Sequence, residues 1–432
     1  MKLLICSIAF VLCITARAEF LSERFSPIST NVVFDGELLV TSDLIALAAR
    51  EASINPRVFD TGSLYLRNRP TTQPTLQRLA QDPPSGDYAN SIALQESILI
   101  VKHAAKTHFY RKQGDQWVPD GLIDSSSRFI TAAGSVAVNS KYLISGMEVY
   151  SWPAREYIQT LTPPNFPGNY TADQVALFDR WPAVISYADG SVWNFVQGEN
   201  GFSTNAIPIN PPDDHARGSF GRQVHYVSGL FLMVSAPYDS EHALNAGAVH
   251  LYMRGEPGQW DHIQKITAPS PMSGDQFGFA ITSDGFREYI SAPTRNETRQ
   301  QSGAIFIFER PDLGVPIIRR EFREKIVLRD AVDRTHLGTA LAVHNGKIYA
   351  SIAGGVVAFH PPITLRVPSP NNDTFYIDGG LNVHTGTLQS TTTLTEPWTD
   401  FPSATYSTGF QFPFNRETKS RFFQLKLRSA FE

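Results

Sequence analysis

Residues with the capacity for chemistry are few and scattered in this 432-residue sequence. None of the eleven histidines belongs to a His-x-x-x-His or glutamate-paired metal motif. Ser191 stands in Gly-Ser-Val, which is not the Gly-x-Ser-x-Gly turn of a serine hydrolase. Asp213-Asp214-His215 could bind a metal or transfer protons, but it follows two prolines, and a polar loop is the simpler interpretation. We therefore predict no catalytic residue, no metal ligand and no cofactor.

Two polar stretches are better candidates for contact with a partner. They extend from Tyr238 to His242 and from Arg295 to Arg299, in the longest well-defined connections between apolar segments. Binding residues concentrate in loops that a rigid scaffold holds in place. The alternative is that both are polar surface loops without a partner. The predicted ligand-binding residues are Tyr238, Asp239, Glu241, His242, Arg295, Asn296, Glu297 and Arg299.

The first 18 residues resemble a secretory signal peptide. Met1-Lys2 is followed by an apolar run from Leu3 to Thr15 and by Ala16-Arg17-Ala18, a small-x-small cleavage pattern. We expect a mature chain that begins near Glu19 and is secreted, displayed at the cell surface or periplasmic, with no membrane span. The sequons at Asn169, Asn296 and Asn372 matter only where the source glycosylates secreted proteins.

Composition restricts the function classes further. Cys6 and Cys13 both lie in the leader, so the mature chain has no cysteine for disulfides, thiolate sites or a nucleophile. The net charge of −4 becomes −6 when Lys2 and Arg17 leave with the leader, which argues against nucleic-acid binding. Hydrophobic residues at 42%, with 30 glycines and 29 prolines, indicate a turn-rich all-β protein with a large core.

A repeated unit must position the two polar stretches. Its anchors are each followed eight residues later by a turn position, and three of the turns read Ser228-Gly229, Asp284-Gly285 and Asn345-Gly346, which are strong hairpin signals. A glycine precedes six of the seven third strands. The anchors are Phe34, Tyr88, Phe220, Phe277 and Leu337, and the glycines are Gly62, Gly146, Gly190, Gly247, Gly303 and Gly355.

Seven four-stranded copies, spaced by roughly 40 to 60 residues, predict a seven-bladed β-propeller over residues 19–368. A tandem of β-sandwiches is the competing fold, but it would not need the same anchor-to-turn spacing. Either Phe20–Ile28 or Ile363–Val367 is expected to complete the last blade.

Two adjacent copies resemble the FG-GAP repeat of integrin α-subunit propellers. Phe220-Gly221 is followed by Ser235-Ala236-Pro237 and Gly247-Ala248-Val249, and Phe277-Gly278 is followed by Ser291-Ala292-Pro293 and Gly303-Ala304-Ile305. Leu337-Gly338 begins a weaker third copy, and the motifs cover residues 218–360. The resemblance implies that connections between second and third strands lie on the face that meets partners.

The same family holds calcium between its first and second strands, in loops of alternating Asp and Asn. This sequence departs from that pattern, because its connections are short and none offers three spaced carboxylates. A calcium ion needs six to eight oxygen ligands, so we do not carry the metal sites over and expect stability to be independent of calcium.

The repeat ends before residues 369–432, which we expect to form a small β-sandwich-like module. Thr387–Ser390, Trp398–Asp400 and Arg421–Leu425 alternate like strands and are similar to modules that end many secreted bacterial proteins. Its basic residues are interpreted as solvated edge charges.

Three functions remain open. The favoured one is a non-enzymatic binding or adhesion-type propeller that recognises an extracellular protein or glycan through the face with Tyr238 and Arg295. The first alternative is a glycan lyase or hydrolase, for which carboxylates should converge at one mouth of the axial channel. The second is a structural surface or matrix component. The short hairpins of the opposite rim are expected to be too small for a partner site.

Overall fold

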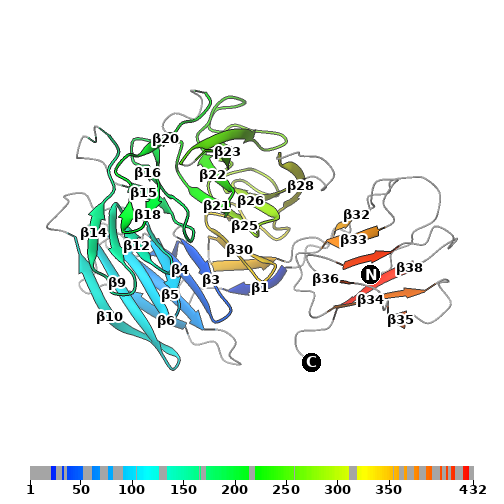
Figure 1. Cartoon of the computed structure of the whole chain (residues 1–432). Coiled ribbons are helices and arrows are strands. Elements are labelled where there is room, and N and C mark those ends of the chain that lie inside the picture. Colours follow the sequence, from blue (N-terminus) through cyan, green and yellow to red (C-terminus); the bar gives the residue numbers. More distant parts are fainter. Residues whose placement is uncertain are drawn as a thin grey trace. The chain divides into compact units, whose positions relative to one another are not determined.

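The computed structural model describes mainly the strands and the connections of the repeat. The described residues are 21–25, 32–33, 37–51, 61–68, 76–80, 91–103, 105–125, 134–164, 166, 172–213, 219–256, 258–310, 319–353, 355–359, 364–366, 374–378, 386–391, 399–400, 405–406, 410–413 and 422–427. Strands make up their regular structure, and these residues contain no helix (Figure 1). The expected leader with its two cysteines and the expected boundary between 368 and 369 lie outside these ranges.

The strands form seven antiparallel sheets that follow one another along the chain, and each sheet is one blade of the propeller. Blade 1 contains β2 (Val32–Val33), β3 (Leu38–Val40), β4 (Leu44–Glu51), β5 (Thr61–Asn68) and β6 (Leu76–Ala80), and blade 2 contains β7 (Ser91–Gln95), β8 (Ile98–His103), β9 (Lys106–Gln113) and β10 (Gln116–Asp124). Blade 3 contains β11 (Val136–Val138), β12 (Tyr142–Ser145), β13 (Glu148–Ser151) and β14 (Tyr157–Thr160), and blade 4 contains β15 (Ala172–Ala176), β16 (Ala183–Tyr187), β17 (Val192–Phe195) and β20 (Ile207–Ile209). Blade 5 contains β21 (Val224–Ser228), β22 (Phe231–Ala236), β23 (Ala248–Arg254) and β24 (Trp260–Ile266), and blade 6 contains β25 (Ile281–Ser283), β26 (Arg287–Ala292), β27 (Ala304–Glu309) and β28 (Glu321–Ile326). Blade 7 contains β29 (Leu341–His344), β30 (Lys347–Ile352), β31 (Gly355–Phe359) and β1 (Leu21–Phe25).

The inner strands close a ring, which confirms the seven-bladed propeller. Around the axis, β3, β7, β11, β15, β21, β25 and β29 each contact the next, and β29 contacts β3 again. The N-terminal strand β1 pairs with β31 and so supplies the outer strand of blade 7. Of the two segments predicted to complete the last blade, the first therefore does so, while β32 (Thr364–Arg366) pairs with β33 (Thr374–Asp378) instead.

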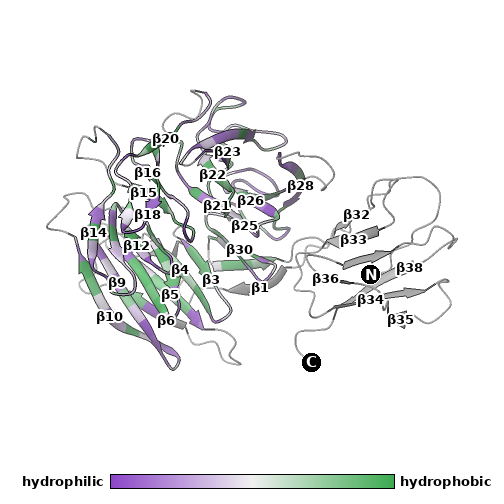
Figure 2. Ribbon diagram, in the orientation of Figure 1, coloured by the Kyte–Doolittle hydropathy of each residue, from purple (hydrophilic) through white to green (hydrophobic). Residues whose placement is uncertain are grey.

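The core lies between successive blades. Between blades 5 and 6, for example, Met233, Leu251, Phe277 and Phe306 form one apolar cluster, and each is at most 2% exposed. The apolar runs of β4 and β22 are visible in Figure 2. Second strands read as continuous apolar runs because both of their faces are buried between neighbouring blades. Each large apolar side chain removed from water contributes about 1.5–3 kcal/mol.

Antiparallel pairing gives the propeller two rims. We call the edge with the connections from second to third strands the loop rim, and the edge with the connections from first to second strands the hairpin rim. Most hairpin connections are as short as predicted, such as residues 229–230 between β21 and β22 and 284–286 between β25 and β26. The connection between β15 and β16 is longer and extends over residues 177–182.

Contacts divide the chain into two compact units, residues 24–344 with 349–357, and residues 1–23, 345–348 and 358–432. In the second unit, β32, β33, β37 (Phe410–Pro413) and β36 (Thr405–Tyr406) form one sheet, and β35 (Thr399–Asp400), β34 (Gly386–Thr391) and β38 (Phe422–Leu427) form another. The three segments expected to be strands after residue 369 thus contain strands.

Candidate functional site

The two predicted binding stretches occupy equivalent places on the loop rim. Loop 5, residues 237–247, joins β22 to β23, and loop 6, residues 293–303, joins β26 to β27. Each begins with the proline of a Ser-Ala-Pro segment and ends at a glycine, Gly247 or Gly303. The predicted connectivity of both loops is therefore confirmed, although their role in binding is a separate question.

Backbone hydrogen bonds fasten each loop to the blade that follows it. Three consecutive carbonyls of loop 5 accept N–H groups from the connection that precedes blade 6. Three consecutive carbonyls of loop 6 accept N–H groups from the connection that precedes blade 7. The donors to Leu244, Asn245 and Ala246 are Gly274, Gln276 and Phe277 at 2.8, 3.1 and 2.9 Å, and the donors to Gln300, Gln301 and Ser302 are Arg334, His336 and Leu337 at 2.7, 3.0 and 3.0 Å. Both loops are thus rigid connections between blades despite their length.

Glycine permits this close approach. Gly247 has φ +86°, and a Cβ atom there would lie 2.2 Å from the carbonyl oxygen of Phe277. Gly303 has φ +80°, and a Cβ atom there would lie 2.6 Å from the amide nitrogen of Leu337. No other residue fits such contacts with a positive φ, which explains why the glycine and the aromatic or Leu anchor recur together.

A glutamate of each loop pairs with a lysine on the fourth strand of the same blade. In blade 5, Lys265 Nζ lies 2.5 Å from Glu241, 2.8 Å from Asp239 and 3.3 Å from Asp213. In blade 6, Lys325 Nζ lies 2.6 Å from Glu297. Hydrogen bonding from Lys265 lowers the pKa of Glu241. The charges of Glu241, Asp239 and Glu297 are therefore engaged within the fold.

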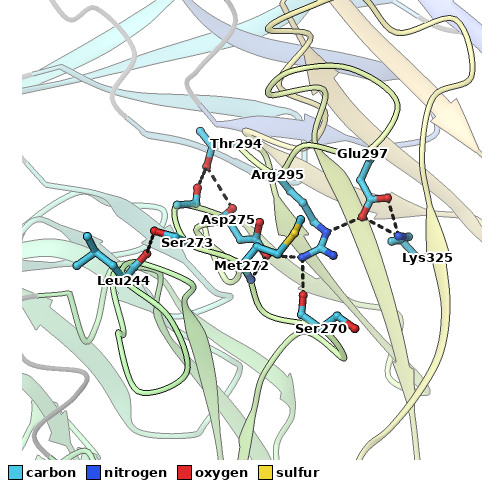
Figure 3. Close-up of polar contacts among 10 residues, drawn as sticks. Leu244, Ser270, Met272, Ser273, Asp275, Thr294, Arg295, Glu297 and Lys325 are labelled. Atoms are coloured by element: carbon cyan, nitrogen blue, oxygen red, sulfur yellow. Dashed lines mark hydrogen bonds and ion pairs between the residues drawn. The ribbon is translucent and has the colours of Figure 1, made fainter.

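Arg295 is buried and holds loop 6 to the adjacent connection (Figure 3). Its Nη1 donates to the Asp275 carboxylate and, at 2.9 Å, to the Ser270 carbonyl, and its Nε donates to Glu297 at 2.5 Å. Burial raises the pKa of Asp275, while the Met272 N–H and the Arg295 guanidinium oppose that effect. An Arg295 substitution is consequently expected to perturb folding as well as any contact with a partner.

Other side chains of the rim remain exposed. Tyr238 is 44% exposed, and His242, Asn296 and Arg299 are also exposed. Sequence reasoning missed Leu244, which is 68% exposed, and Met272, which is 39% exposed. The Leu244 carbonyl accepts the Ser273 hydroxyl at 3.1 Å, which brings the Leu244 segment next to that of Met272. The signal was a large aliphatic side chain among mainly small and polar neighbours, Leu244 in one connection and Met272 in the other.

A second group of charges lies in blade 4 and at the start of blade 5. Asp173 lies on β15 and Arg222 lies two residues before β21, with its guanidinium 5.0 Å from the ring centre of Phe279. Burial raises the pKa of Asp173, Arg222 opposes this, and the nearby Asp189 adds to it. Two carboxylates of blade 4 are thus close enough to interact.

The hairpin rim displays exposed apolar side chains that the sequence analysis did not predict. Phe178, Leu230 and Phe286 lie in the hairpin connections of blades 4, 5 and 6 and are 44%, 44% and 57% exposed. The hairpins are small, but three adjacent ones display a large apolar side chain.

The described contacts of the other residues considered for catalysis or metal binding lie within the fold. Asp213 contacts Lys265, and Asp214 and His215 lie outside the described residues. The Ser191 hydroxyl donates to Asp189 at 2.6 Å in a turn. His250 is buried with its Nδ1 3.3 Å from His262 Nε2, and burial lowers the pKa of His250 to about 4. No three His, Cys, Asp or Glu side chains of the described ranges come together to hold a metal ion, and no helix there is long and apolar enough to cross a membrane.

Comparison with known proteins identifies no family. No family model matches the chain and no curated protein matches it, so the resemblance to FG-GAP repeats is not confirmed. Solved structures do match. A provisionally named 6-phosphogluconolactonase from Bacteroides uniformis has a TM-score of 0.46 and 15% identity and covers 71% of this chain and 88% of its own. Another from Bacteroides fragilis has a TM-score of 0.46 and 13% identity and covers 69% and 86%. The chain is a β-propeller without an assigned family.

Proposed function

We propose that the chain is a secreted or cell-surface, non-enzymatic binding propeller that recognises an extracellular protein with the blade 5 part of its loop rim. The observation that supports this most is the exposure of Leu244, Tyr238 and Met272 on and beside loop 5. Exposed side chains of this size, set among engaged charges, have the composition of a protein-binding patch, in which a few large anchors carry most of the affinity.

Rigidity strengthens the argument. Loop 5 is tied to blade 6 through Leu244, Asn245 and Ala246 and to β24 through Glu241 and Lys265. A loop that is ordered before the partner arrives loses little conformational entropy on binding. The apolar character of the patch favours a protein over a glycan, which remains the alternative ligand.

The test is capture of extracellular proteins by the immobilised chain, followed by affinity measurement with the purified partner and a glycan array in parallel. We expect the Tyr238→Ala and Leu244→Gln variants to weaken binding by about 2 kcal/mol each, roughly thirty-fold in Kd. Leu244→Gln introduces the residue that loop 6 has at the same place, Gln300, so the fold should not change. Leu230→Gln on the hairpin rim is the matched control. Loss of binding with Leu230→Gln and not with Leu244→Gln would contradict the proposal.

A glycan lyase or hydrolase is the second candidate, because Asp173 on the inner strand β15 lies close enough to Asp189 and Arg222 to interact with both. A pair of neighbouring carboxyl groups is the arrangement that glycoside hydrolysis uses. Cleavage of extracellular polysaccharides by the wild-type chain, abolished in Asp173→Asn and retained in Leu244→Gln, would favour this candidate. Absence of cleavage leaves the binding function.

A further inference from the structure

We infer that Asn296 is an acceptor site for an N-linked glycan. Asn296, Glu297 and Thr298 form an Asn-x-Thr sequon, and Asn296 is exposed in loop 6. The other two sequon asparagines, Asn169 and Asn372, lie outside the described residues. The inference rests on the secretory leader and on the surroundings of the Asn296 amide.

The two ends of the amide group have different roles. Asn296 Oδ1 accepts the backbone N–H of Gln301 at 2.7 Å and so closes loop 6. The structure gives Nδ2 no hydrogen-bond partner among the residues it describes. The loop therefore uses the oxygen of the side chain, while the nitrogen is left over.

Loop 5 shows that the nitrogen is not required. At the equivalent place it has Ser240, whose Oγ accepts the backbone N–H of Asn245 at 2.9 Å. The same hydrogen bond thus closes both loops, from a hydroxyl in one and from an amide in the other. An asparagine at 296 adds a free amide nitrogen that the architecture can do without.

Glycosylation would preserve this closure. The co-reactant is an oligosaccharide linked to a polyprenyl diphosphate. Nδ2 attacks C1 of its first sugar, the bond between C1 and the phosphate oxygen breaks, the polyprenyl diphosphate leaves, and the amide nitrogen loses one proton. The product is a secondary amide whose Oδ1 still accepts from Gln301, so the modified chain can adopt the same loop.

A glycan at this place would divide the loop rim. It would shield Asn296 and the neighbouring exposed Arg299 of loop 6, whereas the exposed Tyr238 and Leu244 belong to loop 5. This consequence rests on the proposed binding function, whereas the modification itself does not. A partner would then dock on one half of the rim.

The experiment uses the full chain secreted from a eukaryotic cell line. Peptide mass spectrometry after amidase release of N-glycans in heavy-oxygen water should show Asn296 converted to labelled aspartate. Asn296→Ser, which introduces the residue that loop 5 has at the same place, should be secreted and melt at the wild-type temperature while lacking that glycan. Thr298→Val, which keeps the asparagine but destroys the sequon, should also lack it.

Secretion of a wild-type chain with unmodified Asn296 would overturn the inference, as would failure of the chain to enter the secretory pathway. The binding proposal is tested separately by comparing Leu244→Gln with its parent in the Asn296→Ser background. An effect of Leu244→Gln there supports the blade 5 site whether or not Asn296 carries a glycan.

Discussion

Loops 5 and 6 share one backbone design but present different surfaces. Both end in a glycine against the next blade, offer three carbonyls to it and pair a glutamate with a strand-four lysine. They differ at the positions of Asp239 and Arg295, and of Leu244 and Gln300. What they share therefore builds the propeller. Of the differences, Asp239 and Arg295 are buried in ion pairs, whereas the exposed position of Leu244 and Gln300 is available for recognition.

The glycines should show the largest effect. Gly247→Ala places a Cβ atom 2.2 Å from the Phe277 carbonyl and forces an L-residue into φ +86°. We expect a loss of about 4 kcal/mol in the free energy of unfolding, measured by urea denaturation. The control is Gly285→Ala, which has φ +92° but open space within 4 Å and should cost only about 1 kcal/mol. Equal losses would mean that loop 5 is not packed against blade 6.

The position at which the loops differ in charge should show a smaller effect. Arg295→Leu leaves the buried Asp275 without its cation, and we expect a loss of about 3 kcal/mol. Asp239→Asn in loop 5 should cost about 1 kcal/mol, because Lys265 keeps Glu241 and Asp213 as partners. Thermal and urea unfolding of both variants tests the difference. A larger loss of unfolding free energy in Asp239→Asn than in Arg295→Leu would mean that the charge of loop 5, and not that of loop 6, matters more for stability.

Acidification should show the smallest effect, a difference between the two lysine–glutamate pairs in the stability that each loses. Hydrogen bonding from Lys265 lowers the pKa of Glu241. Burial would raise the pKa of Glu297, but its hydrogen bonds with Lys325 and Arg295 lower that pKa by more. The pKa values of both glutamates therefore lie below the ordinary value of 4.5. Their stabilisation is present above pH 4.5 and is lost as the pH falls through the folded values. Each pair should lose less than about 1 kcal/mol.

The measurement is the unfolding free energy between pH 6 and pH 3, with Glu241→Gln and Glu297→Gln as variants. Glu297→Gln should flatten the profile more, because Glu297 accepts from both Lys325 and Arg295. A steeper profile in either variant would be inconsistent with a lowered pKa.

The fold could be predicted because its signals are local. Glu96 lies between β7 and β8, eight residues after the anchor Tyr88, and Asp179 lies between β15 and β16. Neither turn has a glycine at that place, and both residues adopt the positive φ that such turns require, 54° and 44°. The anchors Phe220, Phe277 and Leu337 are buried, as apolar residues in a fixed spacing should be.

The candidate site was harder to predict because its decisive contacts are not local. A charged residue in a polar loop is normally exposed, yet Arg295 is buried by Asp275, which belongs to the connection that precedes blade 6. The Ser273 hydroxyl of that same connection donates to the Leu244 carbonyl of loop 5, and this contact between separate segments brings the segment of Met272 next to that of Leu244. Sequence spacing within one repeat contains no information about such a pairing.

The closing strand has a consequence for the time course of folding. β1 precedes every other described strand of the propeller, and its partner β31 follows almost all of them. During synthesis from the N-terminus, β1 must wait with an unpaired edge while six complete blades form. A contact between segments so far apart in sequence is slow to form, so ring closure should be the last step of folding. Chains interrupted before Gly355 would then lack the strand that pairs with β1, whatever the stability of the blades already made.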